Sequence, residues 1–312
     1  MTIQLLLQLL VTKGVGDAVI RRVSKFLLRE GVTLADVASL GAAELANALS
    51  VPVEVASRVK GQEEAAARLG QSLCSHDVEL VWLNDERYPK RMTAVLGEDA
   101  PPVLFARGNL RLLEGPAVGF CGSRRASEKG LCVTRKAAQG LAQQGVCVVS
   151  GYASGVDLAA HSAALEAGGG TIFVLVDGIL RFQAKASVRD YLTPENHLIV
   201  SQFPPSLTWI SRNAMKRNAT IIGMSDAMIL VESGTSGGTY SAGTETLKRQ
   251  HPLFVVDFAQ PGPSAEANPF FIQRGGVPVR GNAEGAPNLS RVLAATRSPA
   301  WSQRQRDGQL FE

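Results

Sequence analysis

The sequence has few cysteines, few aromatic residues and no long apolar run. Its four cysteines stand at spacings that match no zinc-binding pattern, and Cys121 and Cys147 fall inside apolar runs typical of buried strands. We expect them to be small apolar residues in a reducing cytoplasm, and we predict no metal site. With aromatic residues at 6% of the chain, the loops expected at the sheet edge carry few side chains suited to reading bases.

No apolar stretch approaches the length of a transmembrane helix, and the apolar start of the chain has no preceding basic region and no clear cleavage site. We therefore expect a soluble, cytoplasmic protein without a membrane partner. A length of 312 residues and a hydrophobic content of 45% suit one large α/β domain with a smaller companion. The formal net charge of +4 permits a nucleic-acid partner without demonstrating one.

The rest of the chain is expected to be organised around residues 117–155. Residues 117–121 are an apolar run too short for a free-standing helix, which favours a strand buried on both faces of a parallel sheet. A helical pattern follows, with Ser127 placed to cap its first turn. A second apolar run at 146–149 leads to another loop of small residues, 150–155. Both loops would then lie at the carboxyl ends of strands, where open α/β sheets bind ligands.

The loop after the first of these strands has the composition of an anion site. Gly122 lets a ligand approach the backbone, amide hydrogens at the following helix start lack intrahelical partners, and Arg124 and Arg125 add cationic donors. The alternative is that the glycine serves only a tight turn and the arginines are solvated. No second glycine stands two places after Gly122, and no acidic residue ends the next strand. The dinucleotide fingerprint is therefore missing, and we predict no cofactor.

Further apolar runs predict the remaining strands of the sheet. Most of them alternate with helical patterns, at intervals of very roughly 30 residues, which indicates an α/β fold with a parallel, doubly wound sheet. These runs are residues 171–176, 198–203, 227–232 and 253–258.

The first 73 residues have a wholly helical pattern, with expected helices at 34–49 and 53–73. Lys13-Gly14-Val15-Gly16 interrupts the first helical stripe and resembles the turn of helix-hairpin-helix modules, which offers backbone amides to a phosphate. The alternative is a turn that only joins two packed helices. We predict four segments: a helical domain at 1–75, a linker and edge segment at 76–115, the sheet domain at 116–296, and a flexible tail at 297–312.

Two acid–base residues lie one turn apart on the helix expected at 156–167. They are Asp157 and His161, and they allow two interpretations. One is a catalytic pair. The other is a carboxylate that anchors the helix start beside a packed, hydrogen-bonded histidine.

Two later segments gather cations. Residues 178–189 form either a mobile basic lid or a solvated connection. Their cations are Arg181, Lys185 and Arg189. Lys216-Arg217-Asn218 is expected to open a helix at 219–224 and so to place cations at a helix start.

Residues 232–245 run from a strand end through glycines and hydroxyl residues into a helix. Several such loops at one sheet edge predict a phosphate-lined groove. The residues that we expect to bind nucleic acid are Gly122, Ser123, Arg124, Arg125, Ser150, Gly151, Lys216, Arg217, Asn218, Gly237, Gly238 and Thr239.

The order of short motifs along the chain resembles the DprA (Smf) family of bacterial DNA-processing proteins. The motifs are Tyr88-Pro89, Pro101-Pro102, Gly108-Asn109, Gly122-Ser123-Arg124, Val149-Ser150-Gly151, Gly155-Val156-Asp157, Ala160-His161, Arg217-Asn218, Ile221-Ile222-Gly223-Met224-Ser225 and Val231-Glu232. The resemblance implies an extended Rossmann-like domain preceded by a helical domain similar to sterile-alpha-motif modules. It also implies single-stranded DNA as a ligand, self-association as a homodimer, and transfer of the DNA to the RecA recombinase.

Several positions depart from the family's pattern. Ala219 stands where an arginine is usual, Gln202 where a glutamate is usual, and Ser236-Gly237-Gly238-Thr239 replaces a Ser-Gly-Ser turn. No C-terminal winged-helix domain is evident. A specialised relative in an antiphage or toxin–antitoxin locus, with a cognate toxin as partner, would have these features.

Three functions remain open on the sequence. The leading hypothesis is a non-enzymatic module that binds single-stranded DNA. The rival is a nucleoside-monophosphate glycosidase like the cytokinin-activating phosphoribohydrolases, with Glu245 at the reacting centre and Arg217 on the phosphate. However, four residues separate Gly238 from Gly243, which places Glu245 inside the expected helix rather than in a compact turn. The third is a protein-interaction role for the helical domain or the tail.

Overall fold

The computed structural model describes residues 3–282 and 285–299, which divide into two compact units. The first unit is formed by residues up to 88 with residues 101–105, and the second by residues 89–100 and those from 106 onward. The tail predicted at 297–312 lies outside the described residues from position 300.

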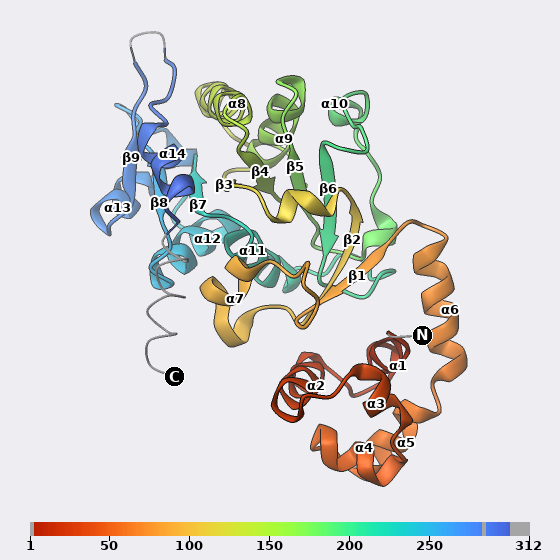
Figure 1. Ribbon diagram of the computed structural model, residues 1–312. Helices are drawn as coiled ribbons and strands as arrows, with labels where there is room; N and C mark the ends of the chain where they lie inside the picture. The colour runs from red at the N-terminus through yellow and green to blue at the C-terminus, as the bar shows by residue number, and fades with distance from the viewer. Residues whose placement is uncertain (1–2, 283–284, 300–312) are drawn as a thin grey trace. The chain divides into compact units, whose positions relative to one another are not determined.

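The described residues of the first unit form helices and a short strand, with the first residues of a second strand at 103–105 (Figure 1). Its elements are α1 (Gln4–Val11), α2 (Asp17–Glu30), α3 (Leu34–Ser39), α4 (Ala42–Leu49), α5 (Val53–Lys60), α6 (Glu63–Cys74) and β1 (Glu79–Trp82). The helices expected at 34–49 and 53–73 are each divided in two. At the first break Glu44 accepts the Gly41 amide hydrogen and begins a new helix, and the second break falls at Gly61, a residue with poor helix propensity.

The second unit is a doubly wound α/β domain, which confirms the predicted fold class. Strands β6 (His197–Ser201), β5 (Thr171–Val174), β4 (Cys147–Ser150), β3 (Ala117–Cys121), β7 (Ala227–Leu230), β8 (Leu253–Val256) and β9 (Val277–Val279) lie side by side in that order. Their pairings are all parallel. Every residue of β3 is buried, as expected for the strand at the centre of such a sheet.

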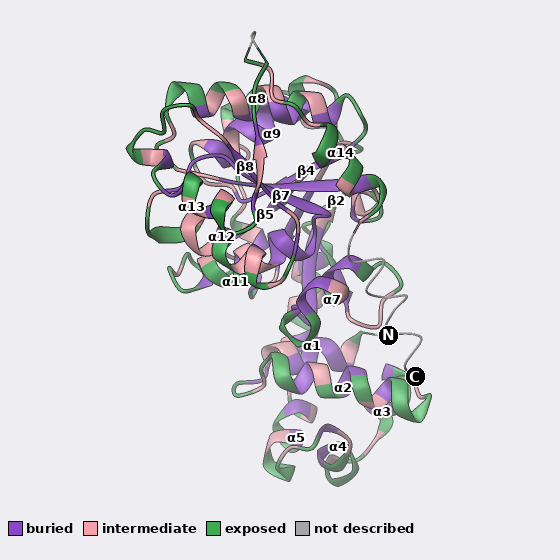
Figure 2. Ribbon diagram, turned by 90° about the vertical axis from the view of Figure 1, so that its left-hand side faces the viewer, coloured by how far each residue is buried: buried purple, intermediate pink, exposed green. Residues whose placement is uncertain are grey.

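Helices cover both faces of this sheet. Figures 1 and 2 show α8 (Glu128–Ala142) and α9 (Val156–Glu166) on one face, and α11 (Asn213–Gly223) and α12 (Gly237–Lys248) on the other. The apolar core under α8 and α9 contains Phe120, Leu141 and Val148, each of them fully buried. Short helices complete the unit, namely α7 (Lys90–Leu96), α10 (Ala186–Arg189), α13 (Asn268–Gln273) and α14 (Ser290–Arg297).

Several short elements were not predicted from the sequence, among them α7 and α10, which lie in segments expected to be a linker and a loop. Strand β2 (Val103–Gly108) follows Pro101-Pro102, whose turn character obscured the apolar run behind it. Strand β9 has only three residues, and Pro278 is one of them, which fits an edge strand. Helix α13 is six residues long and has a proline near its start. A three-residue strand and a six-residue helix such as β9 and α13 are too short to leave a clear periodic pattern in the sequence.

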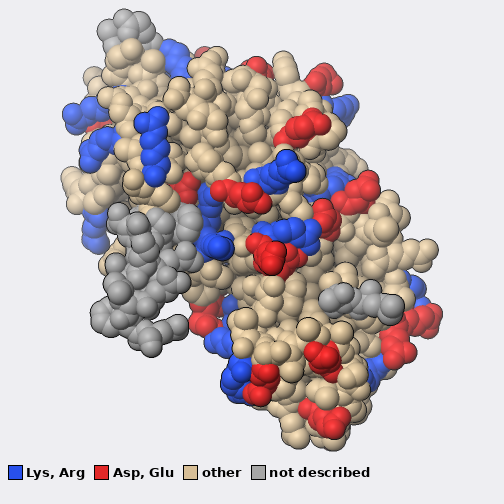
Figure 3. Space-filling model, in the orientation of Figure 1, with Lys and Arg blue, Asp and Glu red and all other residues tan. Residues whose placement is uncertain are grey.

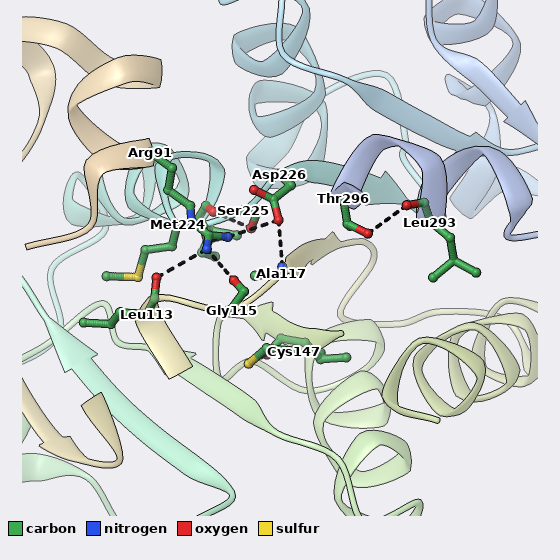
Figure 4. A network of polar contacts seen from close by, with 12 residues as sticks. Arg91, Leu113, Gly115, Ala117, Cys147, Met224, Ser225, Asp226, Leu293 and Thr296 are labelled. Carbon is green, nitrogen blue, oxygen red and sulfur yellow. Dashed lines mark hydrogen bonds and ion pairs between the residues drawn. The ribbon is translucent and has the colours of Figure 1, made fainter. Parts of the chain in front are cut away.

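A buried ion pair ties α7 to the sheet at the end opposite the loops described above. Figure 4 shows Arg91 reaching Asp226, with Nη1 and Oδ2 3.2 Å apart. The same carboxylate oxygen accepts the Ala117 amide hydrogen at 2.8 Å, and Arg91 Nη2 donates to the carbonyl oxygens of Leu113 and Gly115. Because both members of this pair have further hydrogen-bond partners, the cost of burying the two charges is offset within the protein.

The two cysteines predicted to be buried are buried. Burial raises the pKa of both the Cys121 thiol and the Cys147 thiol to about 12, so both remain protonated at neutral pH. Among the described residues, no group of three or more metal-ligating side chains is brought together. None of the helices formed by these residues is long and apolar enough to span a bilayer.

Candidate nucleic-acid interface

The chain reverses its winding direction at β3. After β3 it builds β4, β5 and β6 on one side and then returns to place β7 on the other side. The loops after β3 and β7 therefore diverge and leave a crevice between them, which is where ligands bind in doubly wound sheets. A cavity of about 250 Å³, here called the central pocket, occupies this position.

The central pocket is electrically balanced. It is lined by two arginines and two carboxylates, namely Arg124, Arg217, Asp157 and Glu232. Its remaining polar lining comes from Ser123, Asn218, Ser236 and Thr239.

A second cavity, here called the basic groove, adjoins the central pocket and shares Arg124, Ala153 and Arg217 with it. It measures about 670 Å³. Its lining has five cationic side chains and one carboxylate: Arg124, Arg181, Lys185, Arg189 and Arg217, with Asp177. Partial burial lowers the pKa of Lys185 and raises the pKa of Asp177. The excess of positive charge is therefore concentrated in this groove and not in the central pocket.

The excess of positive charge does not extend over the whole surface of the protein. On the face of the molecule drawn in Figure 3, basic and acidic side chains are interspersed, and the described residues form no extended surface of one sign there. The five cations of the basic groove come from the loops after β3 and β5, from α10 and its start, and from α11. Cations gathered in a cavity in this way focus a field on a bound anion.

Arg217 connects the two cavities. It lies inside α11, not ahead of it as the sequence suggested, because the helix starts at Asn213. The expectation of cations at a helix start is therefore wrong for Lys216-Arg217-Asn218. The buried side of α11 instead carries Arg217 toward α9, where Nη1 lies 3.5 Å from Asp157 Oδ2. Within the described residues, Arg217 Nε is buried and has no hydrogen-bond partner.

Asp157 and His161 serve different partners, so the structure does not assemble them as a catalytic pair. Asp157 accepts the Ala153 amide hydrogen at 3.3 Å. His161 Nε2 is 2.5 Å from Gly151 O, and its Nδ1 is 2.6 Å from Thr171 Oγ1. Burial lowers the pKa of His161 to about 3, so the ring is neutral. Since a carbonyl oxygen only accepts, the neutral ring carries its proton on Nε2 and holds the Gly151 carbonyl in place.

The start of α8 is occupied by a carboxylate of the protein itself. Ser127 caps the helix as predicted, its Oγ accepting the Gly130 amide hydrogen at 3.0 Å. Glu232, two residues after β7, accepts from the Ser127 amide at 2.9 Å and from the Ser127 hydroxyl. The expectation that unpartnered amides at this helix start would hold an external anion is therefore corrected, because Glu232 fills that place.

Two glycines allow the loops to approach this closely. A Cβ atom on Gly151 would overlap the Arg217 guanidinium, so any other residue would displace the arginine. Gly155 has a φ of +78° and faces the Ser123 and Arg124 carbonyls, and both features exclude a side chain.

Some of the residues predicted to bind nucleic acid line the central pocket, and others lie outside both cavities. Seven of them line the central pocket: Gly122, Ser123, Arg124, Arg217, Asn218, Gly238 and Thr239. The other five line neither cavity: Arg125, Ser150, Gly151, Lys216 and Gly237. Ser150 is buried and donates to Phe120 O at 2.8 Å, and Gly151 accepts from His161, so both support the loop from below.

The sequence did not single out the aromatic side chains of the basic groove, which are Tyr152, Phe182 and Trp209. Tyr152 also fixes the basic segment at 178–189, which the sequence left as either a lid or a solvated connection. Its hydroxyl accepts the Lys185 amide hydrogen at 2.6 Å, while Lys185 Nζ donates to Tyr152 O at 3.0 Å. The segment is thus held against the loop after β4. The sequence signal that could have indicated this role is the position of Tyr152 within the loop of small residues at 150–155.

Glu245 lies on α12 and lines neither cavity. Its Oε1 is 2.7 Å from Arg249 Nη2, which is also 2.8 Å from Asp99 Oδ2. The structure therefore brings Arg217, but not Glu245, to the central pocket.

Comparison with known proteins identifies the family. The model of the DNA recombination-mediator protein A family matches residues 79–284, which include every residue of the two cavities. The chain belongs to this family. It is 35% identical to the DNA processing protein DprA of Streptococcus pneumoniae over 174 residues, which are 55% of this chain and 60% of the relative. Protein Smf of Escherichia coli is 29% identical over 212 residues, 67% of this chain and 56% of the relative.

Two solved structures of the family have similar folds. The structure of DNA processing protein A from S. pneumoniae covers 87% of this chain and 92% of its own, with a TM-score of 0.74 and 26% identity. That from Helicobacter pylori, which binds single-stranded DNA, covers 64% of this chain and 90% of its own, with a TM-score of 0.55 and 27% identity. The sequence matches span about 60% of the length of the curated relatives.

Proposed function

We propose that this protein binds single-stranded DNA along the basic groove and acts in DNA processing without being an enzyme. The observation that carries the proposal is the groove's charge, five cations to one carboxylate in an open cavity at the carboxyl edge of the sheet. Single-stranded DNA offers repeated phosphates to such a groove, and their contacts need no particular base. Membership of the DNA recombination-mediator family and the DNA-binding Helicobacter pylori relative support it.

Salt dependence tests the mechanism. Binding of a labelled single-stranded oligonucleotide is measured by fluorescence anisotropy between 50 and 300 mM salt, a range chosen around about 0.15 M ionic strength. Contact with three to five phosphates predicts a slope of log K against log salt of about −2 to −3.5. No binding at low salt would refute the proposed function, and salt-independent binding would refute the phosphate mechanism.

The same proposal extends to the partners. We propose that the protein acts as a homodimer that delivers the DNA to a RecA-type recombinase, with membership of an antiphage or toxin–antitoxin locus as the alternative. The measurement is DNA strand exchange by RecA on DNA coated with single-strand-binding protein, with and without this protein. Faster exchange is expected, and unchanged exchange would favour the alternative, which the neighbouring genes would then identify.

A further inference from the structure

The basic groove contains three aromatic residues, and two of them have their rings occupied within the protein. Lys185 Nζ lies 4.5 Å from the centroid of the Tyr152 ring. The Phe182 ring packs 5.1 Å from that of Tyr152, and Arg107 approaches it to 5.6 Å. Both rings are therefore already engaged in contacts that hold the groove together.

Trp209 differs from both. Its side chain is 54% exposed, and in the part of the chain that the structure describes its indole takes part in no ring contact, cation–π contact or hydrogen bond. A tryptophan left half in water forgoes much of the stabilisation that its burial would give. The indole lies in a groove whose lining includes five cations, and a flat apolar surface contributes nothing to the binding of phosphate alone.

The backbone on either side of Trp209 is fixed. On one side Leu207 O accepts the Gly178 amide hydrogen at 2.9 Å, which ties this loop to the loop after β5. On the other side Ile210 O accepts the Asn213 amide hydrogen at 3.0 Å, at the start of α11. The indole is therefore carried between two anchored points. Such positioning reduces the entropy lost when a ligand stacks on it.

We propose that Trp209 is the base-stacking residue of this groove, so that the protein recognises the bases of single-stranded DNA as well as its phosphates. This inference rests on the proposed function. Cations of the groove hold the phosphates while one base lies flat on the indole. Because every base has a π face, stacking is tolerant of sequence and agrees with the expectation of no strong sequence preference.

The test compares two ligands with the same phosphates. One is an oligothymidylate, and the other is an abasic oligonucleotide of equal length, which has no base to stack. Trp209→Leu keeps an apolar side chain and removes the π face. It should weaken oligothymidylate binding by about five- to a hundredfold and leave the weaker abasic binding unchanged. Trp209→Phe should recover part of the loss, and the salt slope should be the same for all three proteins.

Tyr191→Leu is the matched control, because Tyr191 is an exposed aromatic residue, 45% accessible, that lines neither cavity. It should bind both ligands like the unaltered protein. A second readout is tryptophan emission, taken as the difference from Trp209→Phe, which should be quenched by oligothymidylate and not by the abasic strand.

Equal losses for the two ligands in Trp209→Leu, or no loss for either, would overturn the inference while leaving DNA binding established. If the unaltered protein bound neither ligand, the proposed function itself would fail.

Discussion

Arg217 and Asp157 form an ion pair, with Nη1 and Oδ2 3.5 Å apart and each side chain only 10% exposed, where the central pocket meets the basic groove. The pair has two effects on the site. It fixes a guanidinium that faces both cavities, and it cancels that guanidinium's charge on the side of the central pocket. The basic groove keeps an excess of positive charge. Besides Arg217 it is lined by four cations, and Asp177 is the one carboxylate among its lining residues.

Removing the Asp157 carboxylate should show separately how the ion pair affects stability and how it affects the charge of the site. Asp157→Asn leaves Arg217 buried without its counter-charge, so we expect the free energy of unfolding to fall by about 2–4 kcal/mol. The folded variant should bind single-stranded DNA at least as tightly as the unaltered protein, since the site loses a negative charge. Urea unfolding at pH 7 and anisotropy titration measure the two quantities.

Asp190→Asn is the control for this substitution, because Asp190 is exposed and lines neither cavity. Its stability should stay within about 0.5 kcal/mol of the unaltered protein. An Asp157→Asn variant that unfolded at the same urea concentration as this control would show that the ion pair contributes nothing to stability.

Arg124 is the exposed cation that lines both cavities. Arg124→Ala should weaken DNA binding by about 1–3 kcal/mol, as expected for the loss of a charge-assisted hydrogen bond to a phosphate. The melting temperature should change little, because an exposed side chain buries no core. Arg124→Lys should recover only part of the affinity, since lysine keeps the charge but lacks the forked donors.

Arg125→Ala is a control one residue away, for Arg125 is exposed and lines neither cavity. We expect it to lose less affinity than Arg124→Ala. Full binding by Arg124→Ala together with a melting temperature several degrees lower would instead make Arg124 a structural residue.

The sequence predicted the parts of the fold that depend on hydrophobic periodicity and on the order of elements along the chain. The buried run at β3, the cap at Ser127 and the placing of loops at strand ends follow from local patterns that the fold does not override. These features were enough to predict the doubly wound sheet and the crevice.

Contacts between distant segments were not predictable in the same way. Glu232 meets Ser127 across 105 residues, and no local pattern reveals that a carboxylate will fill the start of α8. The start of α11 was misplaced because its N-cap residue is Arg212, which is not a typical capping residue and makes no side-chain cap hydrogen bond. The role of Tyr152 depends on Lys185, 33 residues away, and appears only when the two loops are folded together.

Glu245 tests the enzymatic alternative. Glu245→Gln should leave DNA binding unchanged, because the side chain is paired with Arg249 and lines neither cavity. It should cost less than about 1 kcal/mol of stability, the usual range for a pair that is partly exposed. Release of free base from nucleoside monophosphates is measured alongside. Base release by the unaltered protein that disappears in the variant would refute the binding-only function.

His161 should make stability depend on pH. Burial lowers its pKa to about 3 in the folded protein, with the bond to Gly151 O opposing the shift and Arg217 and Lys185 adding to it. In the unfolded chain the pKa returns to about 6.5. Below about pH 6.5, His161 is protonated in the unfolded state but remains neutral in the folded state. Stability from this residue is therefore complete above about pH 6.5 and is lost as the pH falls toward 3, by at most about 1.4 kcal/mol per pH unit.

The variant that isolates this contribution is His161→Gln, which retains an N–H donor for Gly151 O and does not titrate. Loss of the ring's packing should make it less stable than the unaltered protein at pH 7.5, by about 1–3 kcal/mol. Other titrating groups act on both proteins equally, so the difference between their unfolding free energies should shrink as the pH is lowered from 6.5 to 4.5. A difference that stayed constant over this range would mean that His161 takes up a proton in the folded protein, and that the Gly151 carbonyl is held by a charged ring.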